Sequence, residues 1–234
     1  MKKLSFLTFV FSLAFGFFLI APALLSQPFE PFPLIRTGEV VDIFTPLVLI
    51  PLYWLLFQFG SRQFPDLKSI IVFLILAALW VEGQGMHLAA NSIGHWLNST
   101  RGSNAYQLTK FFDEVLSHYL WHIGIIGLST LLLYRQWQYP FTGQQAKLTL
   151  EIVAGIIYGG TFFLIIIEAG TVPFGVPYAL LVTLFGLIWG RDKLRQQPVL
   201  AFFLVGYGLA TLLFAGWGIY WGGFPQFSEV GIIQ

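Results

Sequence analysis

The four histidines of this chain lie within residues 82–122, in company with three acidic side chains. The set comprises His87, His95, His118, His122, Glu82, Asp113 and Glu114. Neutral imidazole and carboxylate together suit zinc, iron, manganese or copper. The chain contains no cysteine, so a metal site here must use nitrogen and oxygen ligands. The residue types therefore favour metal chemistry, provided that the surrounding elements bring them together.

Those elements are predicted to be membrane-spanning helices. The chain is 56% hydrophobic and 10% charged, whereas an ordinary soluble domain carries about 25% charged residues. Apolar runs of roughly the 20 residues that a spanning helix needs occur at 5–25, 41–60, 69–97, 112–134, 149–169, 174–190 and 199–221. The polar connections between them are too short to bury a separate core. We therefore predict an all-α, polytopic membrane helix bundle with seven transmembrane helices, forming one domain over residues 1–234.

The distribution of Lys and Arg predicts how this bundle sits in the membrane. Seven spans place nine of these residues on the side of the N-terminus and three on the other. The positive-inside rule then puts the N-terminus in the cytoplasm and the C-terminus outside. The first apolar run is longer than the core of a typical signal peptide, which favours a retained helix over a cleaved signal.

The third span carries a polar stripe in its outer half. Steps of three and four residues return to nearly the same side of a helix, which groups Gln84, His87, Asn91 and His95. Glu82 lies well round the helix from His87. The glycines that flank it at 83 and 85 could allow a local bulge that turns it toward the stripe.

A second stripe opens the fourth span, where Glu114, His118 and His122 follow one another at intervals of four. The two spans are consecutive and antiparallel, and residues 98–109 are expected to join them as an outer loop. The stripes should therefore face each other in the outer half of the membrane, with Glu168 at the end of the fifth span in reach. Asp113 is interpreted as an acidic residue at a helix N-terminus, and Glu151 as a solvated residue at the inner interface.

Ionisable groups are costly inside a bilayer and are functional there by default. We expect a metalloenzyme whose ligands are His87, His118, His122, Glu114 and Glu168, with catalytic roles for Glu114, Glu82 and His95. Zinc is the favoured metal and iron the alternative. A water activated by the metal would attack a lipid-like ester, amide or phosphate presented by the membrane. The net charge of +1 offers nothing for nucleic-acid binding.

Three other functions use the same residues. A two-metal oxidase or hydroxylase would employ the four histidines with Glu82, Glu114 and Glu168. A b-type haem between His87 and His122 would make the protein an electron carrier. A small proton- or cation-coupled transporter would use the stripes as a relay, although the inner halves of the third and fourth spans provide few polar residues to continue it.

Overall fold

The structure, a computed structural model, describes residues 2–143 and 146–232, which are all-α and contain no β-strand. Seven helical units within these ranges are long and apolar enough to cross a membrane. They are α1 (Lys2–Leu24), α2 (Thr37–Phe59), α3 (Leu67–Leu97), the continuous unit of α4 (Asn104–Phe111), η2 (Phe112–Leu116) and α5 (Ser117–Gln138), α6 (Leu148–Glu168), α7 (Val172–Phe185) with its short extensions η3 (Gly186–Gly190) and η4 (Arg191–Lys193), and α8 (Pro198–Trp221). The predicted fold class is confirmed, and the chain is a multi-pass membrane protein.

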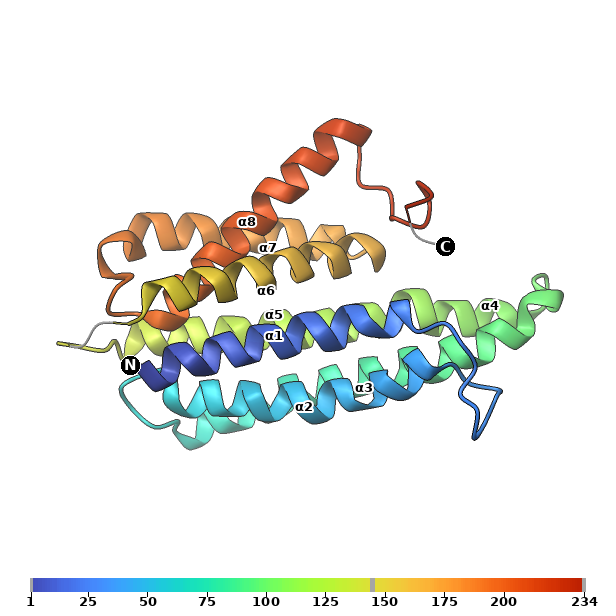
Figure 1. The fold of residues 1–234 in the computed structure, drawn as a ribbon, viewed down its shortest axis with the longest axis horizontal. Coiled ribbons are helices and arrows are strands. Elements are labelled where there is room, and N and C mark those ends of the chain that lie inside the picture. Colours follow the sequence, from blue (N-terminus) through green and yellow to red (C-terminus); the bar gives the residue numbers. More distant parts are fainter. Residues whose placement is uncertain (1, 144–145, 233–234) are drawn as a thin grey trace.

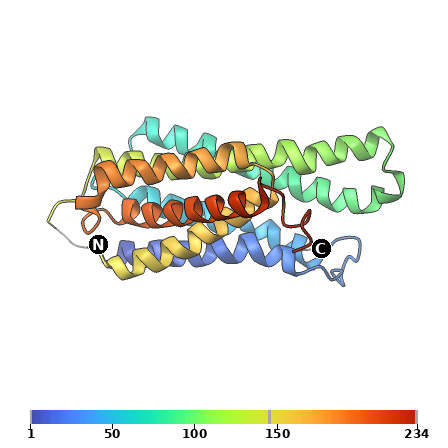
Figure 2. The same cartoon turned by 90° about the horizontal axis from the view of Figure 1, so that it is seen from above.

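The helices form two packed groups. In Figure 1, α1, α2, α3 and α5 run side by side, and α6, α7 and α8 lie above them. Extensive contacts join α3 to α5, α6 to α8 and α1 to α6, so α6 connects the two groups. The outer end of α8 leans away from the other helices. Viewed from above, the long helices are nearly parallel over most of their length (Figure 2).

Some helix pairs approach so closely that only glycine fits at the contact. A Cβ atom on Gly83 of α3 would lie 2.5 Å from the backbone nitrogen of Trp121 in α5. A Cβ atom on Gly159 of α6 would lie 2.1 Å from the carbonyl oxygen of Gly206 in α8. Small residues permit such close backbone approach between membrane helices. The contact at Gly83 matters for the site, because it sets the spacing between the two histidine-bearing helices.

The outer connection between α3 and α5 differs from the predicted loop 98–109. Residues Asn98–Thr100 form one 3-10 turn, and the chain is helical again from Asn104. The hydroxyl of Ser103 starts this helix by accepting a hydrogen bond from the backbone N–H of Tyr106 at 3.2 Å, a normal N-cap interaction. The hairpin of α3 and α4 therefore projects beyond the other helices (Figures 1 and 2).

The same extension overturns the interpretation of Asp113 as a residue at a helix N-terminus. Asp113 lies in η2, a π-helical turn inside the continuous helical unit that starts at Asn104. Single π turns within α-helices widen the helix locally and occur frequently at functional sites. The turn thus re-aims the side chains that precede α5.

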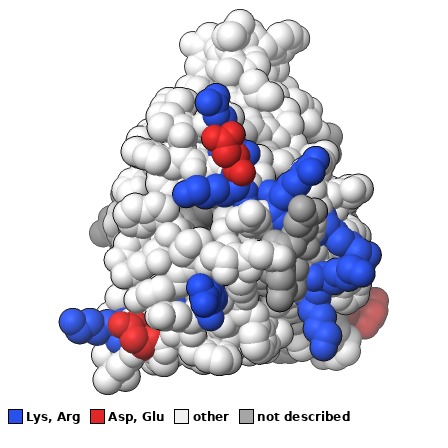
Figure 3. Space-filling view, turned by 90° about the vertical axis from the view of Figure 1, so that its left-hand side faces the viewer, with Lys and Arg blue, Asp and Glu red and all other residues white. Residues whose placement is uncertain are grey.

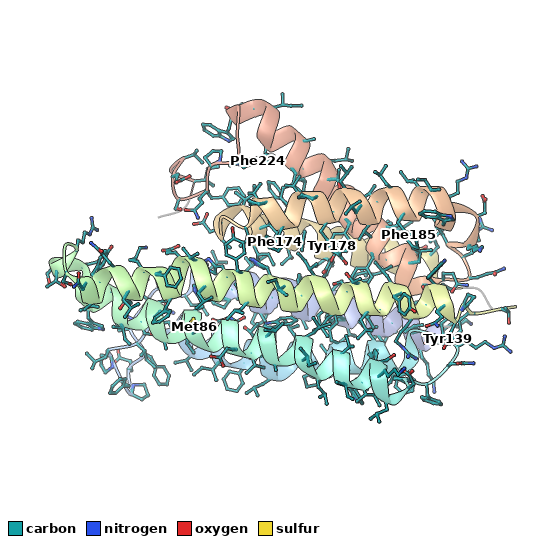
Figure 4. All side chains as sticks on the ribbon, turned by 180° about the vertical axis from the view of Figure 1, so that it is seen from behind. Met86, Tyr139, Phe174, Tyr178, Phe185 and Phe224 are labelled. Atoms are coloured by element: carbon teal, nitrogen blue, oxygen red, sulfur yellow. The ribbon has the colours of Figure 1, made fainter. Side chains whose placement is uncertain are left out.

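A polar network lies at the centre of the bundle. The hydroxyl of Ser129 lies 3.2 Å from that of Tyr53 and 3.1 Å from that of Tyr158, and the Tyr158 and Tyr207 hydroxyls are 2.8 Å apart. These four residues come from α2, α5, α6 and α8, and all are fully buried. Tyr178 of α7 points toward α5 (Figure 4), where Thr130 donates a hydrogen bond to its hydroxyl at 3.0 Å. Buried hydroxyls within a membrane need such partners.

Candidate functional site

A cavity of about 370 Å³ opens at the end of the bundle opposite the N-terminus. Its walls are the last turns of α1 and α6, the first turns of α2, the outer part of α3, and η2 with the start of α5. Its polar lining consists of Ser26, Arg36, Glu39, Asp42, Gln84, His87, Asn91, Asp113, Glu114, His118 and Glu168. Two of the four histidines and five carboxylates therefore border one space.

His87 and His118 lie next to each other across the α3–α5 contact. Their ring centroids are 4.9 Å apart. The Nδ1 atom of His87 lies 2.9 Å from Oδ1 of Asp113, whose side chain is buried. The antiparallel stripes expected from the sequence are thus brought together at these two residues. Asp113, which the sequence interpretation set aside, is the carboxylate nearest to His87.

His118 and His122 are each held through the Nδ1 atom. The Nδ1–H of His118 donates to the backbone carbonyl of Glu114 at 3.1 Å. The Nδ1 atom of His122 lies 2.7 Å from the hydroxyl oxygen of Thr171. His122 is buried behind His118, with 6.3 Å between the ring centroids, and its Nε2 atom has no hydrogen-bond partner. His122 does not border the cavity directly.

His95 lies outside the cavity lining, about two helical turns beyond His87 along α3. Its Nε2 atom is 3.7 Å from Oε1 of Glu39 on α2, which is too long for a hydrogen bond. The other oxygen of Glu39, Oε2, accepts a hydrogen bond from the backbone N–H of Arg36 at 2.8 Å. His95 thus approaches the site only through Glu39.

Asp42 is a site residue that the sequence analysis missed. The side-chain amide of Gln84 donates to both carboxylate oxygens of Asp42 at 2.8 Å, and Thr45 donates to Oδ1 at 2.9 Å. Gln84 in turn accepts a hydrogen bond from the indole of Trp80 at 3.2 Å. Asp42 belongs to the predicted apolar run 41–60, so a carboxylate within a span was the available signal.

The three predicted glutamates, Glu82, Glu114 and Glu168, differ in their relation to the cavity. Glu82 is exposed on α3, which stays helical through Gly83 and Gly85, and it does not border the cavity. Glu114 lines the cavity and pairs with Lys110, one helical turn earlier. Glu168 also lines the cavity, but its Oε2 atom accepts hydrogen bonds from the backbone N–H groups of Phe227 and Ser228 at 2.8 and 3.3 Å. Glu168 therefore anchors the segment that follows α8.

Glu151 is not solvated as expected. Its side chain, in the first turn of α6, is fully buried and accepts a hydrogen bond from the hydroxyl of Thr8 at 2.7 Å. The second carboxylate oxygen, Oε1, is buried without a partner. The expectation failed because α1 packs along α6 and covers this turn, a contact that the hydropathy of α6 alone does not reveal.

The histidines and carboxylates of the cavity are close neighbours, but their present rotamers do not form a complete ligand set. In residues 2–143 and 146–232, no three side chains of His, Asp or Glu are grouped as a metal ion would require. No protein-family model, curated protein or solved structure matches this chain.

Proposed function

We propose that this chain is an integral membrane metalloenzyme that hydrolyses a lipid-like substrate in the cavity. The observation that supports the proposal is the environment of the Nδ1 atom in three imidazoles. Each has Nδ1 next to an oxygen atom of another residue, and a ring that carries its proton on Nδ1 would have Nε2 free for a metal: His87 lies beside Asp113, His118 beside the Glu114 carbonyl, and His122 beside Thr171. Histidines that ligate metals usually have the other ring nitrogen fixed in this way, by a carboxylate or a backbone carbonyl.

The composition of the cavity also suits a bound cation. His87 and His118 supply two imidazoles at neighbouring positions, and Asp113 and Glu114 supply carboxylates beside them. Nitrogen and oxygen ligands of this kind favour zinc, with iron as the alternative. Since the present rotamers do not form a ligand set, we expect these side chains to rotate toward one another when a metal binds. His122 lies one turn deeper and would join or support the site from behind His118.

A divalent metal in such a site lowers the pKa of a bound water and polarises a carbonyl or phosphoryl oxygen. The other contributions to catalysis would come from protein side chains. Asp113, whose Oδ1 atom lies 2.9 Å from Nδ1 of His87, would orient the His87 ring. Glu114 borders the cavity and is assigned the proton-transfer role, whereas Glu82 and His95 do not border it. Apolar side chains on the α1 side of the cavity, Leu19 and Leu25 among them, provide a surface for acyl chains.

The proposed orientation places this cavity toward the outer leaflet. Among the charged side chains visible on the end of the bundle that holds the N-terminus, Lys and Arg predominate over Asp and Glu (Figure 3). Nine of the twelve Lys and Arg residues belong to that side of the seven spans. Under the positive-inside rule this end is cytoplasmic, and the C-terminus and the cavity lie on the outer side.

Metal analysis of the detergent-purified protein tests the proposal. We expect about one equivalent of zinc or iron in the wild-type protein, and loss of that metal in His87→Ala and His118→Ala. His95→Ala is the matched control, because this histidine shares the α3 stripe but not the cavity lining. Size-exclusion chromatography establishes that each variant remains folded. Absence of metal from the wild type after incubation with zinc, or full retention in both ligand variants, would overturn the proposal.

A second candidate function, proton- or cation-coupled transport, is favoured by one observation. The buried network of Tyr53, Ser129, Tyr158 and Tyr207 continues polar groups into the middle of the bundle, and Glu151 lies buried toward the N-terminal end. The inner halves of α3 and α5 have few polar residues, but the side chains of this network also come from α2, α6 and α8. Proteoliposomes with an internal pH dye would test it: transport predicts a proton flux in the wild type that Glu151→Gln removes.

A further inference from the structure

The cavity contains more negative than positive formal charge. Its carboxylates are Glu39, Asp42, Asp113, Glu114 and Glu168, and Arg36 is the one Lys or Arg among its lining residues in the part of the chain that the structure describes. Lys110 pairs with Glu114. Within the described ranges, no Lys or Arg side-chain nitrogen lies within 4.0 Å of the carboxylates of Glu39 or Asp42. Charges that are buried in proteins are normally paired, so these two carboxylates indicate a cationic ligand.

Local interactions hold the carboxylates of Glu39 and Asp42 in place on the α2 side of the cavity. Glu39 lies in the first turn of α2, where the positive end of the helix dipole stabilises negative charge. Asp42 receives hydrogen bonds on both oxygens, from Gln84 and Thr45. An ionised carboxylate accepts hydrogen bonds on both oxygens, as Asp42 does here.

Glu39 provides an independent indication of a cationic ligand. Its side chain lines the cavity and is about 6% exposed, and its Oε1 atom has no hydrogen-bond partner, because the Nε2 atom of His95 lies 3.7 Å away. A buried acceptor without a donor costs free energy, and a ligand that supplies N–H groups would remove that cost. A primary ammonium has three N–H donors and one positive charge, whereas a quaternary ammonium has the charge without a donor.

We propose that the cavity binds a lipid with a protonated primary amine in its headgroup, and that Glu39 receives the ammonium group, with Asp42 beside it. The acyl chains would lie against the apolar side of the cavity formed by Leu19, Leu25 and Ile165. This inference names the substrate class of the proposed hydrolase, and in that respect it rests on the proposed function. Binding itself requires no metal and can be measured without turnover.

The test is a binding titration of the detergent-purified chain in the presence of EDTA. The probes are the short-chain dihexanoyl forms of phosphatidylethanolamine, phosphatidylcholine and phosphatidylglycerol, with free ethanolamine as the chain-free amine. We expect phosphatidylethanolamine to bind at least about tenfold more tightly than each of the other three. Equal affinity for the choline or glycerol lipid would overturn the amine assignment. Equal affinity for ethanolamine would overturn the assignment of a lipid.

Glu39→Gln is the informative variant. Glutamine retains an oxygen acceptor for the backbone N–H of Arg36, so the start of α2 should be preserved, while the negative charge is lost. We expect this variant to lose the preference for phosphatidylethanolamine, and the control Glu82→Gln, on the exposed side of α3, to retain it. A preference that survives in Glu39→Gln would overturn the proposal. If Glu39→Gln has a lowered melting temperature, Asp42→Asn provides the same comparison.

The outcomes separate this inference from the proposed function. A protein without metal or hydrolytic activity that still prefers the amine lipid would contradict the hydrolase but support the binding site. A metal-containing hydrolase that turns over all three lipids equally would support the hydrolase and contradict the amine site.

Discussion

The imidazole of His87 on α3 lies against the carboxylate of Asp113 in the π-helical turn before α5, with 2.9 Å between Nδ1 and Oδ1. On a regular α-helix, two residues five apart are separated by about 140° around the axis. The π turn over Phe112–Leu116 reduces that separation, so Asp113 and His118 both border the cavity. A local irregularity of the helix thus brings a carboxylate to the histidine pair.

Asp113→Asn should impair the site without unfolding the bundle. The amide has nearly the same shape as the carboxylate but cannot stabilise a charged or metal-bound His87 in the same way. Carboxylates that orient metal-ligating histidines typically contribute 10- to 100-fold to metal affinity or activity, and we expect a loss of about that size in zinc affinity. Competition with a chelating dye measures it. Asp192→Asn, at an exposed position near the opposite end of the bundle, is the control and should leave zinc affinity unchanged.

Gly83→Ala should separate the two histidine-bearing helices. The new methyl group would lie 2.5 Å from the Trp121 backbone nitrogen and 2.6 Å from the Ser117 carbonyl oxygen, neither of which can rotate away. Overpacking of this kind typically costs about 1–3 kcal/mol of unfolding free energy. The melting temperature in detergent should fall accordingly. Gly85→Ala is the matched control, since a Cβ there meets nothing within 4 Å, and an equal loss in both variants would contradict the close α3–α5 contact.

Glu168→Ala should release the segment that follows α8. The Oε2 atom of Glu168 accepts the backbone N–H groups of Phe227 and Ser228, and the loss of a charged acceptor removes both hydrogen bonds. We expect amide hydrogen exchange at these two residues to accelerate by about tenfold or more. The exposed Glu30→Ala provides the control. Unchanged exchange at Phe227 in Glu168→Ala would show that other contacts hold the segment.

The start of α3 should lose stability at acidic pH. Hydrogen bonds from the side chain and backbone N–H of Ser69 lower the pKa of the exposed Asp66 below its usual 3.8. A carboxyl group whose pKa is lower in the folded state stabilises that state fully above its unfolded pKa, and the contribution disappears as pH falls through the folded value. The melting temperature of the wild type should therefore exceed that of Asp66→Ala at pH 6, and the difference should shrink below pH of about 4. A constant difference across this range would contradict the N-cap role of the ionised carboxylate.

The seven spans could be predicted because each is an apolar run near 20 residues, and that property depends on the lipid environment more than on tertiary contacts. The beginning of the fourth unit could not be predicted this way. Its first helix, α4, is the polar sequence Asn104–Phe111, which extends past the apolar run and carries no hydropathy signal.

The site was predictable where regular helical geometry holds. The proximity of His87 and His118 follows from two antiparallel stripes on consecutive spans. The role of Asp113 depends on a π turn, and those of Glu39 and Asp42 depend on the rotation of α2 against α3. Neither the turn nor the rotation has a signature in residue spacing. The burial of Glu151 likewise results from the packing of α1 on α6.

The long α3–α4 hairpin provides a site at which the orientation of the protein in the membrane can be measured. At about 1.5 Å per residue, the 31 residues of α3 extend roughly 46 Å, well beyond a hydrocarbon layer of about 30 Å. Its tip at Gly102 is exposed and has room for a side chain. Because the chain has no native thiol, Gly102→Cys introduces a unique one, and a membrane-impermeant maleimide should label it on intact cells. Labelling confined to inverted vesicles would reverse the assigned topology and move the cavity to the cytoplasmic leaflet.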